Sequence, residues 1–241
     1  MRIRHAAGDI TWALVALKAP QTAKSRLRSL LSASQRRELF FALARKVFAA
    51  LQLTPGIARV LVVTSSAEVA RFARGLDVEV IPQGEEQGTA AAFQHALVTL
   101  QTAPYWRDGD SPGPDRLLMI AGDLPLISCA ALADLLQQFD GRSGVCIVPD
   151  RLRVGTNALL CSPPDAIAPC FGADSFAQHC GAARAARVPL IVHESAALAL
   201  DIDGVDDLAL LGSQLFRSGV AHRAENLDVA DLLRRLGTQH S

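Results

Sequence analysis

The sequence predicts a single-domain, three-layer α/β sandwich, in which helices cover both faces of a mostly parallel β-sheet. Two observations predict this class. The chain has 241 residues, half of them hydrophobic, which is the size of one α/β domain that buries a core without disulfides. Short apolar segments also alternate with helical patterns, which is the order that builds parallel strands joined by helices.

Short apolar segments, bounded by turn or charged residues, are expected to form the strands. The first is apolar almost throughout, as in a strand buried on both faces. The third ends at Pro82, and the fourth, RLLMIA, ends at Gly122 and Asp123. In chain order, the predicted strands are residues 10–17, 59–64, 78–81, 116–121, 144–148, 156–161, 190–193 and 198–202.

Capping residues mark the starts of the helices between these strands. A Ser followed three residues later by Gln or Glu forms a capping box, in which each side chain bonds the other residue's backbone N–H. The expected caps are Ser32 with Gln35, Ser65 with Glu68, Ser128 and Asp174. The predicted helices end near residues 51, 75, 101, 139, 186 and 211.

The domain is expected to cover residues 1–213. The remaining residues, 214–241, form a C-terminal tail, in which residues 227–236 have the pattern of an amphipathic helix. We expect this helix to pack on the domain or at the interface of a homodimer.

Composition and charge argue against several classes of partner. The 24 Lys and Arg residues balance 24 Asp and Glu residues, whereas nucleic-acid-binding proteins carry a basic excess. No apolar run approaches the roughly 20 residues that span a bilayer. The five cysteines are odd in number and lack C-x-x-C spacing, which favours thiols in a reducing cytoplasm. We therefore expect a cytoplasmic protein without nucleic-acid or membrane partners.

Basic and hydroxyl residues gather in the turn after the first strand. Ligands of open α/β sheets bind outside the carboxyl ends of the strands, and this turn contains Lys18, Lys24, Ser25 and Arg26. Because Lys and Arg bind phosphate groups, the turn is a candidate site for the phosphates of a nucleotide. The alternative is a solvated basic turn. The turn is not a Walker A loop, since G-x-x-x-x-G-K-[ST] is absent.

A second candidate is the helix start at Gly88 and Thr89. Glycine permits close approach of a ligand to the backbone, and a helix N-terminus favours anionic or hydrogen-bonding groups. The alternative is an ordinary turn between a strand and a helix.

Three aspartates are candidate metal ligands. Asp123 directly follows an apolar strand, and Asp201 and Asp203 flank Ile202, so that in extended chain both carboxylates point to one face. Paired carboxylates repel each other unless a cation lies between them, and Mg²⁺ takes oxygen ligands. The pattern therefore predicts a magnesium site. The alternatives are a turn stabilised by Asp123 and a helix N-cap at Asp203.

Another motif could hold a small anion. Thr156 lies in the sequence GTN, and Gly172 and Ser175 lie in FGADSF. A backbone N–H at Gly172 and the two hydroxyls could together bind an anion, although each residue singly is an ordinary loop residue. His95 and His179, each in a predicted helix, are expected to be packing or surface residues.

In this order, these elements resemble a known family. The stretches LKAPQTAKSRL, GDLPL, VGTNALL, FGADSFAQH and LALDIDGVDDLALL are similar to those of the phospholactate guanylyltransferases called CofC or FbiD, of coenzyme F420 biosynthesis. That family belongs to the nucleotidyltransferases of the nucleotide-diphospho-sugar transferase (GT-A, Rossmann-like) fold. GDLP and DID recur across the superfamily, whereas AKSRL combined with GTNALL and FG-x-x-SF is narrower.

The resemblance implies a reaction and a set of site residues. The reaction joins GMP from GTP to 2-phospho-L-lactate, 3-phospho-D-glycerate or phosphoenolpyruvate, with Mg²⁺ as cofactor and pyrophosphate as product. Lys18, Lys24, Arg26 and Asp123 are implied as catalytic. The implied metal ligands are Asp123, Asp201 and Asp203; the phospho-acid residues are Thr156, Asn157, Gly172 and Ser175; the nucleotide residues are Lys18, Lys24, Ser25, Arg26, Gly88 and Thr89.

One stretch departs from the family. Where the family commonly has Gly-Leu-Asn-Ala-Ala, this chain has Gly88-Thr89-Ala90-Ala91-Ala92, and Ala90 lacks the side-chain amide of Asn. The Gly-Thr-Ala form is more similar to sugar-1-phosphate nucleotidyltransferases. The alternatives are therefore a sugar-1-phosphate or molybdenum-cofactor nucleotidyltransferase, a glycosyltransferase of the same fold, and a non-catalytic nucleotide-binding regulator. The three aspartates argue against the regulator.

Overall fold

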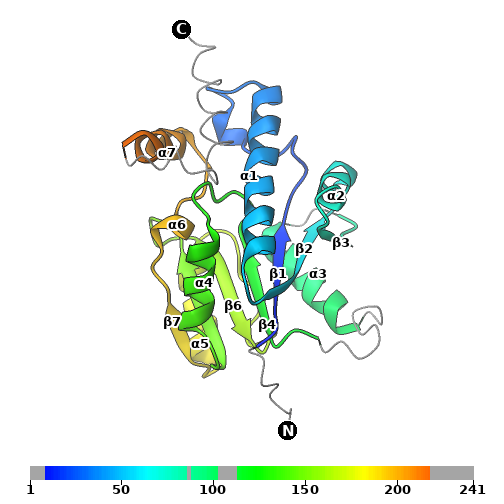
Figure 1. Cartoon of the computed structure of the whole chain (residues 1–241), viewed down its shortest axis with the longest axis vertical. Coiled ribbons are helices and arrows are strands. Elements are labelled where there is room, and N and C mark those ends of the chain that lie inside the picture. The colour runs from blue at the N-terminus through cyan, green and yellow to red at the C-terminus, as the bar shows by residue number, and fades with distance from the viewer. Residues whose placement is uncertain (1–8, 86–87, 103–112, 218–241) are drawn as a thin grey trace.

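The computed structural model describes residues 9–85, 88–102 and 113–217. Within them, seven strands form one sheet in the order β3-β2-β1-β4-β6-β5-β7 (Figure 1). Strand β6 runs antiparallel to its neighbours β4 and β5, and every other pair is parallel. The predicted α/β fold with a mostly parallel sheet is confirmed.

The strands follow the apolar segments of the sequence. They are β1 (Thr11–Ala16), β2 (Ile57–Thr64), β3 (Glu79–Pro82), β4 (Arg116–Ile120), β5 (Gly144–Pro149), β6 (Thr156–Ser162) and β7 (Leu190–Val192). The helices are α1 (Ala33–Leu53), α2 (Ala67–Arg74), α3 (Thr89–Thr102), α4 (Cys129–Gln138), α5 (Ser175–Ala185), α6 (Ala196–Ala199) and α7 (Val205–Arg217), with a short 3₁₀ turn η1 (Ser25–Leu27) before α1.

The helix caps confirm two predictions and correct two others. Both bonds of the Ser32–Gln35 capping box are present, and the Ser128 side chain caps α4. The second capping box is wrong, because Ser66 rather than Ser65 accepts the bond from the Val69 N–H. Asp174 does occupy the N-cap position of α5, but its backbone is left-handed and its side chain makes no cap bond.

The eighth predicted strand, residues 198–202, is absent from the sheet. Its apolar residues alternate, but α6 covers the first of them, and residues 200–203 belong to no helix or strand. The alternation of apolar residues arises because Leu200 and Ile202 pack into a local core rather than onto a neighbouring strand. Helix α7 continues to Arg217, past the predicted helix end at 211 and domain boundary at 213, and residues 227–236 lie outside the described residues.

Helices cover both faces of the sheet, which gives three layers. On one face, α1, α2 and α4 pack against alternate side chains of the central strands, for example Val15 and Ile120. On the other face, α3 and α5 pack against the intervening side chains, for example Trp12 and Leu14 (Figure 1). Strand β1 therefore buries both of its faces, as its uninterrupted apolar sequence requires.

A third, smaller core lies at the carboxyl end of the sheet. It joins η1, α1 and α7 to the segment after α6, and its members include Leu27, Leu39, Ile202 and Leu211. This core matters for the site, because it fixes two charged segments, residues 24–26 and 201–203, against the same apolar support.

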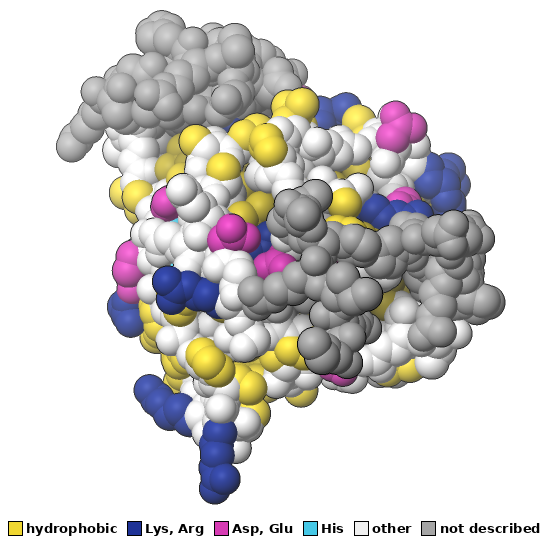
Figure 2. Space-filling view, turned by 60° about the horizontal axis from the view of Figure 1, so that its bottom comes forward, with side chains coloured by type: hydrophobic (Ala, Val, Ile, Leu, Met, Phe, Trp, Pro, Cys, Tyr) yellow, Lys and Arg dark blue, Asp and Glu magenta, His cyan; other side chains and the backbone are white. Residues whose placement is uncertain are grey.

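The surface is mixed in charge. On the face shown in Figure 2, basic and acidic side chains of the described residues are interspersed among hydrophobic and neutral ones. This distribution agrees with a formal net charge of zero. Among the described helices, none combines the length and apolar character needed to cross a membrane.

Candidate functional site

A cleft opens where β1 and β4 end side by side in the middle of the sheet. Strand β1 is followed in the chain by β2 on one side, whereas β4 lies on its other side, so this is the point where strand order reverses. The cleft has a volume of about 350 Å³, within the range of small-ligand sites. Its walls bring together seven predicted residues: Lys18, Lys24, Ser25, Arg26, Thr89, Asp123 and Asp203.

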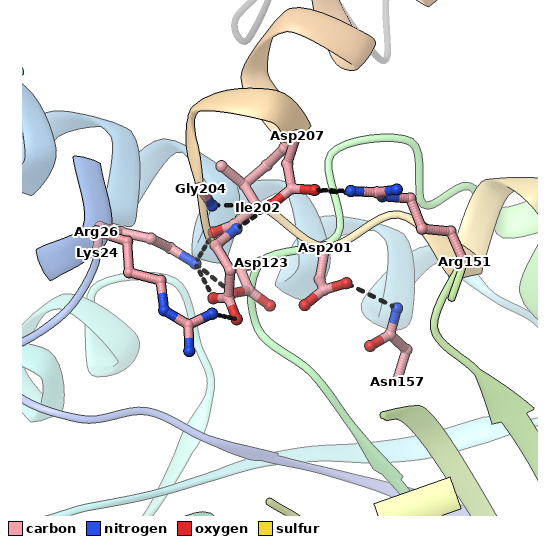
Figure 3. A network of polar contacts seen from close by, with 10 residues as sticks. Lys24, Arg26, Asp123, Arg151, Asn157, Asp201, Ile202, Gly204 and Asp207 are labelled. Atoms are coloured by element: carbon pink, nitrogen blue, oxygen red, sulfur yellow. Dashed lines mark hydrogen bonds and ion pairs between the residues drawn. The ribbon is translucent and has the colours of Figure 1, made fainter. Parts of the chain in front are cut away.

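Lys24 lies at the centre of the charged cluster (Figure 3). Its backbone is left-handed (φ 55°), and its side chain is only 6% exposed. The Nζ group donates to the Asp123 carboxylate and to the Ile202 carbonyl oxygen, and it lies 3.7 Å from Asp203 Oδ1. A buried ammonium needs such partners, since desolvation of an unpaired charge is costly. Lys24 thus joins the end of β4 to the segment 201–203.

The other two cations of this loop face solvent. The Arg26 side chain is 78% exposed, with Nη1 3.8 Å from Asp203 Oδ2, and Lys18 is exposed on the same cleft wall. Because long exposed side chains reorient at little cost, these two residues are available to an anionic ligand entering the cleft. Ser25 is also exposed and begins η1.

Asp201 lies in an electrostatic environment that disfavours its negative charge. Burial raises the pKa of its carboxyl group to about 6, and the charges of Asp123 and Asp203 act in the same direction. The Asn157 amide, 3.5 Å away, opposes this effect by donating to Asp201 Oδ1. The carboxylates of the three predicted metal ligands are therefore close enough to interact electrostatically.

These carboxylates do not form a ready-made coordination sphere. Among the residues that the structure describes, no group of three His, Cys, Asp or Glu side chains has the geometry to hold a metal ion. The Lys24 ammonium instead occupies the position between Asp123 and Asp203. The donor set nevertheless fits a hard cation, because carboxylate oxygens are the ligands that Mg²⁺ prefers.

Asn157, predicted to bind substrate, anchors the backbone of a neighbouring segment. Its side-chain amide donates to the carbonyl oxygens of Leu198 and Ala199, both at 3.0 Å, and the residue is only 4% exposed. These bonds tie β6 to the segment that carries Asp201. Asn157 therefore helps to position the segment that carries Asp201, a candidate metal ligand.

Asp207 is a site residue that sequence reasoning missed. Its carboxylate accepts hydrogen bonds from the backbone N–H groups of Asp203 (3.0 Å) and Gly204 (2.8 Å), and it pairs with Arg151 at 2.7 Å. Since α7 begins at Val205, Gly204 rather than Asp203 is in the N-cap position, and Asp207 bonds back to the Gly204 N–H as the N3 residue of a capping box does. The signal was an acidic residue in the first turn of a helix, three residues after a glycine.

The predicted anion-binding residues also meet at this edge of the sheet. The Ala121 N–H donates to the Asn157 carbonyl at 2.8 Å, so the start of β6 lies beside the end of β4. The Thr156 N–H donates to Ser175 Oγ at 2.9 Å, which joins β6 to the start of α5. Gly172 lies in the exposed loop before α5 with φ 131°, a value that favours glycine.

The helix start at Gly88 and Thr89 lies on the other side of the cleft. Gly88 has φ 92°, and its carbonyl accepts the first helical bond of α3 from the Ala92 N–H. With Lys18 and Ser65, these two residues line a shallow depression next to the main cleft. The structure therefore brings the predicted phosphate turn and the predicted helix-start site together.

Comparison with known proteins shows which family the chain resembles. The chain matches the family model "Guanylyl transferase CofC like" over residues 11–227. It is 35% identical to a phosphoenolpyruvate guanylyltransferase of Conexibacter woesei, over 88% of this chain and 92% of that protein. It is 30% identical to a 2-phospho-L-lactate guanylyltransferase of Methanothermobacter thermautotrophicus, over 82% of each chain.

A solved structure supports the fold independently. A protein of Desulfovibrio desulfuricans, assigned as a nucleotide-diphospho-sugar transferase, superposes with a TM-score of 0.69 at 17% identity, over 94% of this chain and 97% of that one. This likeness establishes the nucleotide-diphospho-sugar transferase fold. The family match covers most of the chain and includes every candidate site residue, so the chain belongs to the CofC-like guanylyl transferase family.

Proposed function

We propose that this protein transfers GMP from GTP to a small phosphorylated carboxylic acid and releases pyrophosphate, in coenzyme F420 biosynthesis. Phosphoenolpyruvate is the first candidate acid, because the relative from Conexibacter woesei is named for it. 2-Phospho-L-lactate, for which the Methanothermobacter relative is named, is the second. 3-Phospho-D-glycerate, which the sequence resemblance implied, completes the set to be tested.

The observation that carries the proposal is the cleft between β1 and β4. Cationic side chains suited to phosphate and carboxylates suited to a divalent cation lie together in it. Nucleotidyl transfer needs this combination, since both substrates are polyanions and the work is charge neutralisation and positioning.

The reaction needs no protein nucleophile. A phosphate monoester has a second pKa of about 6 and is already largely dianionic near neutral pH. Its oxygen attacks the α-phosphorus of GTP, a new P–O bond forms, and the bond to the β-phosphate oxygen breaks as pyrophosphate leaves. Lys18 and Arg26, exposed at the cleft, would bind the leaving phosphates and offset their growing charge.

Asp123, Asp201 and Asp203 are the residues that would hold Mg²⁺. When bound, the ion would neutralise charge on the phosphate oxygens of both substrates. Lys24 would then give up part of its contact with Asp123 and remain bonded to the Ile202 carbonyl. Thr156, Asn157, Gly172 and Ser175 would hold the phospho-acid, and Gly88 and Thr89 would contact the nucleotide.

A second candidate function has one observation in its favour. The chain has Ala90 where the family commonly has Asn, in a Gly-Thr-Ala helix start similar to that of sugar-1-phosphate nucleotidyltransferases. A sugar-1-phosphate or molybdenum-cofactor substrate would then replace the phospho-acid.

One assay separates these functions. Pyrophosphate release is measured with Mg²⁺ for each of the four nucleoside triphosphates against each of the three phospho-acids and a panel of sugar-1-phosphates. Release with GTP and a phospho-acid is the expected result. Release only with a sugar-1-phosphate would overturn the phospho-acid assignment. GTP binding without turnover would indicate a regulator, and nucleoside diphosphate release from a nucleotide sugar would indicate a glycosyltransferase.

We further propose that the protein acts in the cytoplasm as a homodimer, with residues 214–241 on the domain or at the interface. Light scattering of the full chain and of a chain ending at residue 217 tests the assembly. A dimer that becomes a monomer on truncation is expected if the tail forms the interface.

A further inference from the structure

His179, on α5, is buried and is bonded at both ring nitrogens. It is 0% exposed. The backbone N–H of Cys170 donates to His179 Nε2 at 2.8 Å. On the other side of the ring, Nδ1 lies 2.9 Å from Thr156 Oγ1. The imidazole therefore joins the loop that carries Gly172 to the first residue of β6.

These two contacts determine which nitrogen carries the proton. A backbone N–H can only donate, so Nε2 must accept and bears no hydrogen in the neutral ring. The proton of neutral His179 is therefore on Nδ1, and Nδ1–H donates to Thr156 Oγ1.

The neutral form of this ring is also the one that burial favours. Burial lowers the pKa of His179 to about 4, against the opposing effect of the Ser175 carbonyl. The Phe171 ring packs edge-on against the imidazole, with the ring centroids 5.0 Å apart. The Nδ1–H tautomer is thus the form present near neutral pH.

The hydrogen-bonding capacity of Thr156 follows from this tautomer. A hydroxyl has one proton to donate, and Thr156 Oγ1 receives a hydrogen bond from His179. The Thr156 hydroxyl therefore does not donate its own proton to the imidazole. In the opposite tautomer Nδ1 would be an acceptor, and the Thr156 hydroxyl would donate its proton to it. Ser175 is in the same position, since its Oγ accepts from the Thr156 N–H.

We propose that His179 is a positioning residue for the phosphorylated acid: through Nδ1–H it holds the Thr156 hydroxyl as a donor toward the acid's acceptor oxygens, and through Nε2 it holds the loop that carries Gly172. Phosphate and carboxylate groups at neutral pH are chiefly acceptors, so a site for them needs oriented donors. This inference rests on the proposed function, because it assumes that Thr156 and Gly172 contact the acid.

The first test separates the two substrates kinetically. His179→Leu has a similar volume and removes both hydrogen bonds of the imidazole. We expect it to raise the KM for the phospho-acid about tenfold, which corresponds to about 1.4 kcal/mol, the worth of one hydrogen bond between Thr156 and the acid. The KM for GTP is expected to change less than about twofold. His179→Asn retains an N–H near the Nδ1 position and is expected to recover most of the phospho-acid KM. His95→Leu, the same change at an exposed histidine of α3, is the matched control.

A double-mutant cycle distinguishes positioning from general destabilisation. In a Thr156→Val background the hydroxyl is gone, so His179→Leu is expected to raise the phospho-acid KM much less than it does in the unmodified chain, and the remaining increase would come from the loop that Nε2 holds. Additive effects in the cycle would overturn the proposal, because they would mean that His179 acts independently of Thr156.

The tautomer can be read directly and does not depend on turnover. Nitrogen-15 NMR of the full chain near pH 7 is expected to show His179 protonated at Nδ1 and not at Nε2. A proton on Nε2, or on both nitrogens, would overturn the proposal. No pyrophosphate release by the unmodified chain would instead overturn the proposed function, together with the role given to Thr156. Turnover with an unchanged phospho-acid KM in His179→Leu would overturn the role of His179 alone.

Discussion

Lys24 and Asp123, which are 99 positions apart in the sequence, form an ion pair at the centre of the cleft. Lys24 follows β1 and Asp123 follows β4, and the two strands are parallel neighbours, so their carboxyl ends deliver both side chains to one place. The pair joins the cation-rich loop to the carboxylates of the candidate metal site. The first two predictions concern the two members of this ion pair.

Asp123→Asn is expected to lower kcat by about a thousandfold while leaving the fold intact, because it removes charge from a proposed metal ligand without changing its volume. The Lys24 ammonium retains the Ile202 carbonyl as a partner in this variant. Steady-state kinetics with circular dichroism checks both parts. Asp134→Asn, an exposed position on α4, is the matched control. Activity near that of the unmodified enzyme would remove Asp123 from the metal role.

Lys24→Met is expected to lower the free energy of unfolding by about 2 kcal/mol without divalent cation. Breaking a buried ion pair costs about 3–5 kcal/mol, and the partial exposure of Asp123 reduces this value. If Asp123 and Asp203 bind Mg²⁺, the ion should stabilise this variant more than the unmodified protein. Thermal denaturation with MgCl₂, with NaCl at equal ionic strength and with EDTA measures the difference. Equal shifts in both proteins would argue against competition between Lys24 and the ion.

Asp207→Ala is expected to lower kcat about tenfold and the free energy of unfolding by about 1 kcal/mol, since two backbone N–H groups lose their acceptor. The effect on kcat arises because those N–H groups belong to Asp203 and Gly204, which adjoin the metal site. Asp206→Ala, the exposed neighbour in the same helical turn, should change neither quantity. Equal effects of the two substitutions would contradict a specific role for Asp207.

The stability of the protein is expected to depend on pH through His179. Burial lowers the pKa of His179 from 6.5 to about 4. Below about pH 6.5 the unfolded chain binds a proton that the folded protein does not, so stability present above this pH is lost as the pH falls toward 4. The full effect is about 3 kcal/mol.

A comparison with His179→Asn isolates this contribution, because Asn does not titrate. Denaturant unfolding of both proteins is measured from pH 7.5 to 4.5. The stability difference between unmodified protein and variant should decrease as the pH falls. A difference that stays constant across this range would mean that His179 titrates alike in the folded and unfolded states.

Local sequence was sufficient wherever neighbouring residues decide the structure. Ser32 and Gln35 are three residues apart and bond each other's backbone, so their pattern predicted the start of α1 correctly. The choice between Ser65 and Ser66 depended on a further contact that the capping-box pattern does not contain, because the Thr64 hydroxyl accepts from the Ser66 N–H and helps to set where α2 begins. Residues 198–202 were misjudged for a related reason: alternating burial also arises when an extended segment packs on a local core.

The sequence by itself determined the α/β class, most element positions and the residues that gather at the carboxyl edge of the sheet, because apolar periodicity and strand direction depend on the chain's own order. Only the tertiary structure decided that Lys24 pairs with Asp123, that Asn157 bonds the carbonyls of Leu198 and Ala199, and that His179 donates to Thr156. Each of these is a contact between side chains or backbone groups of different elements. Their partners, exposure and tautomers exist only once the strands and helices have packed together.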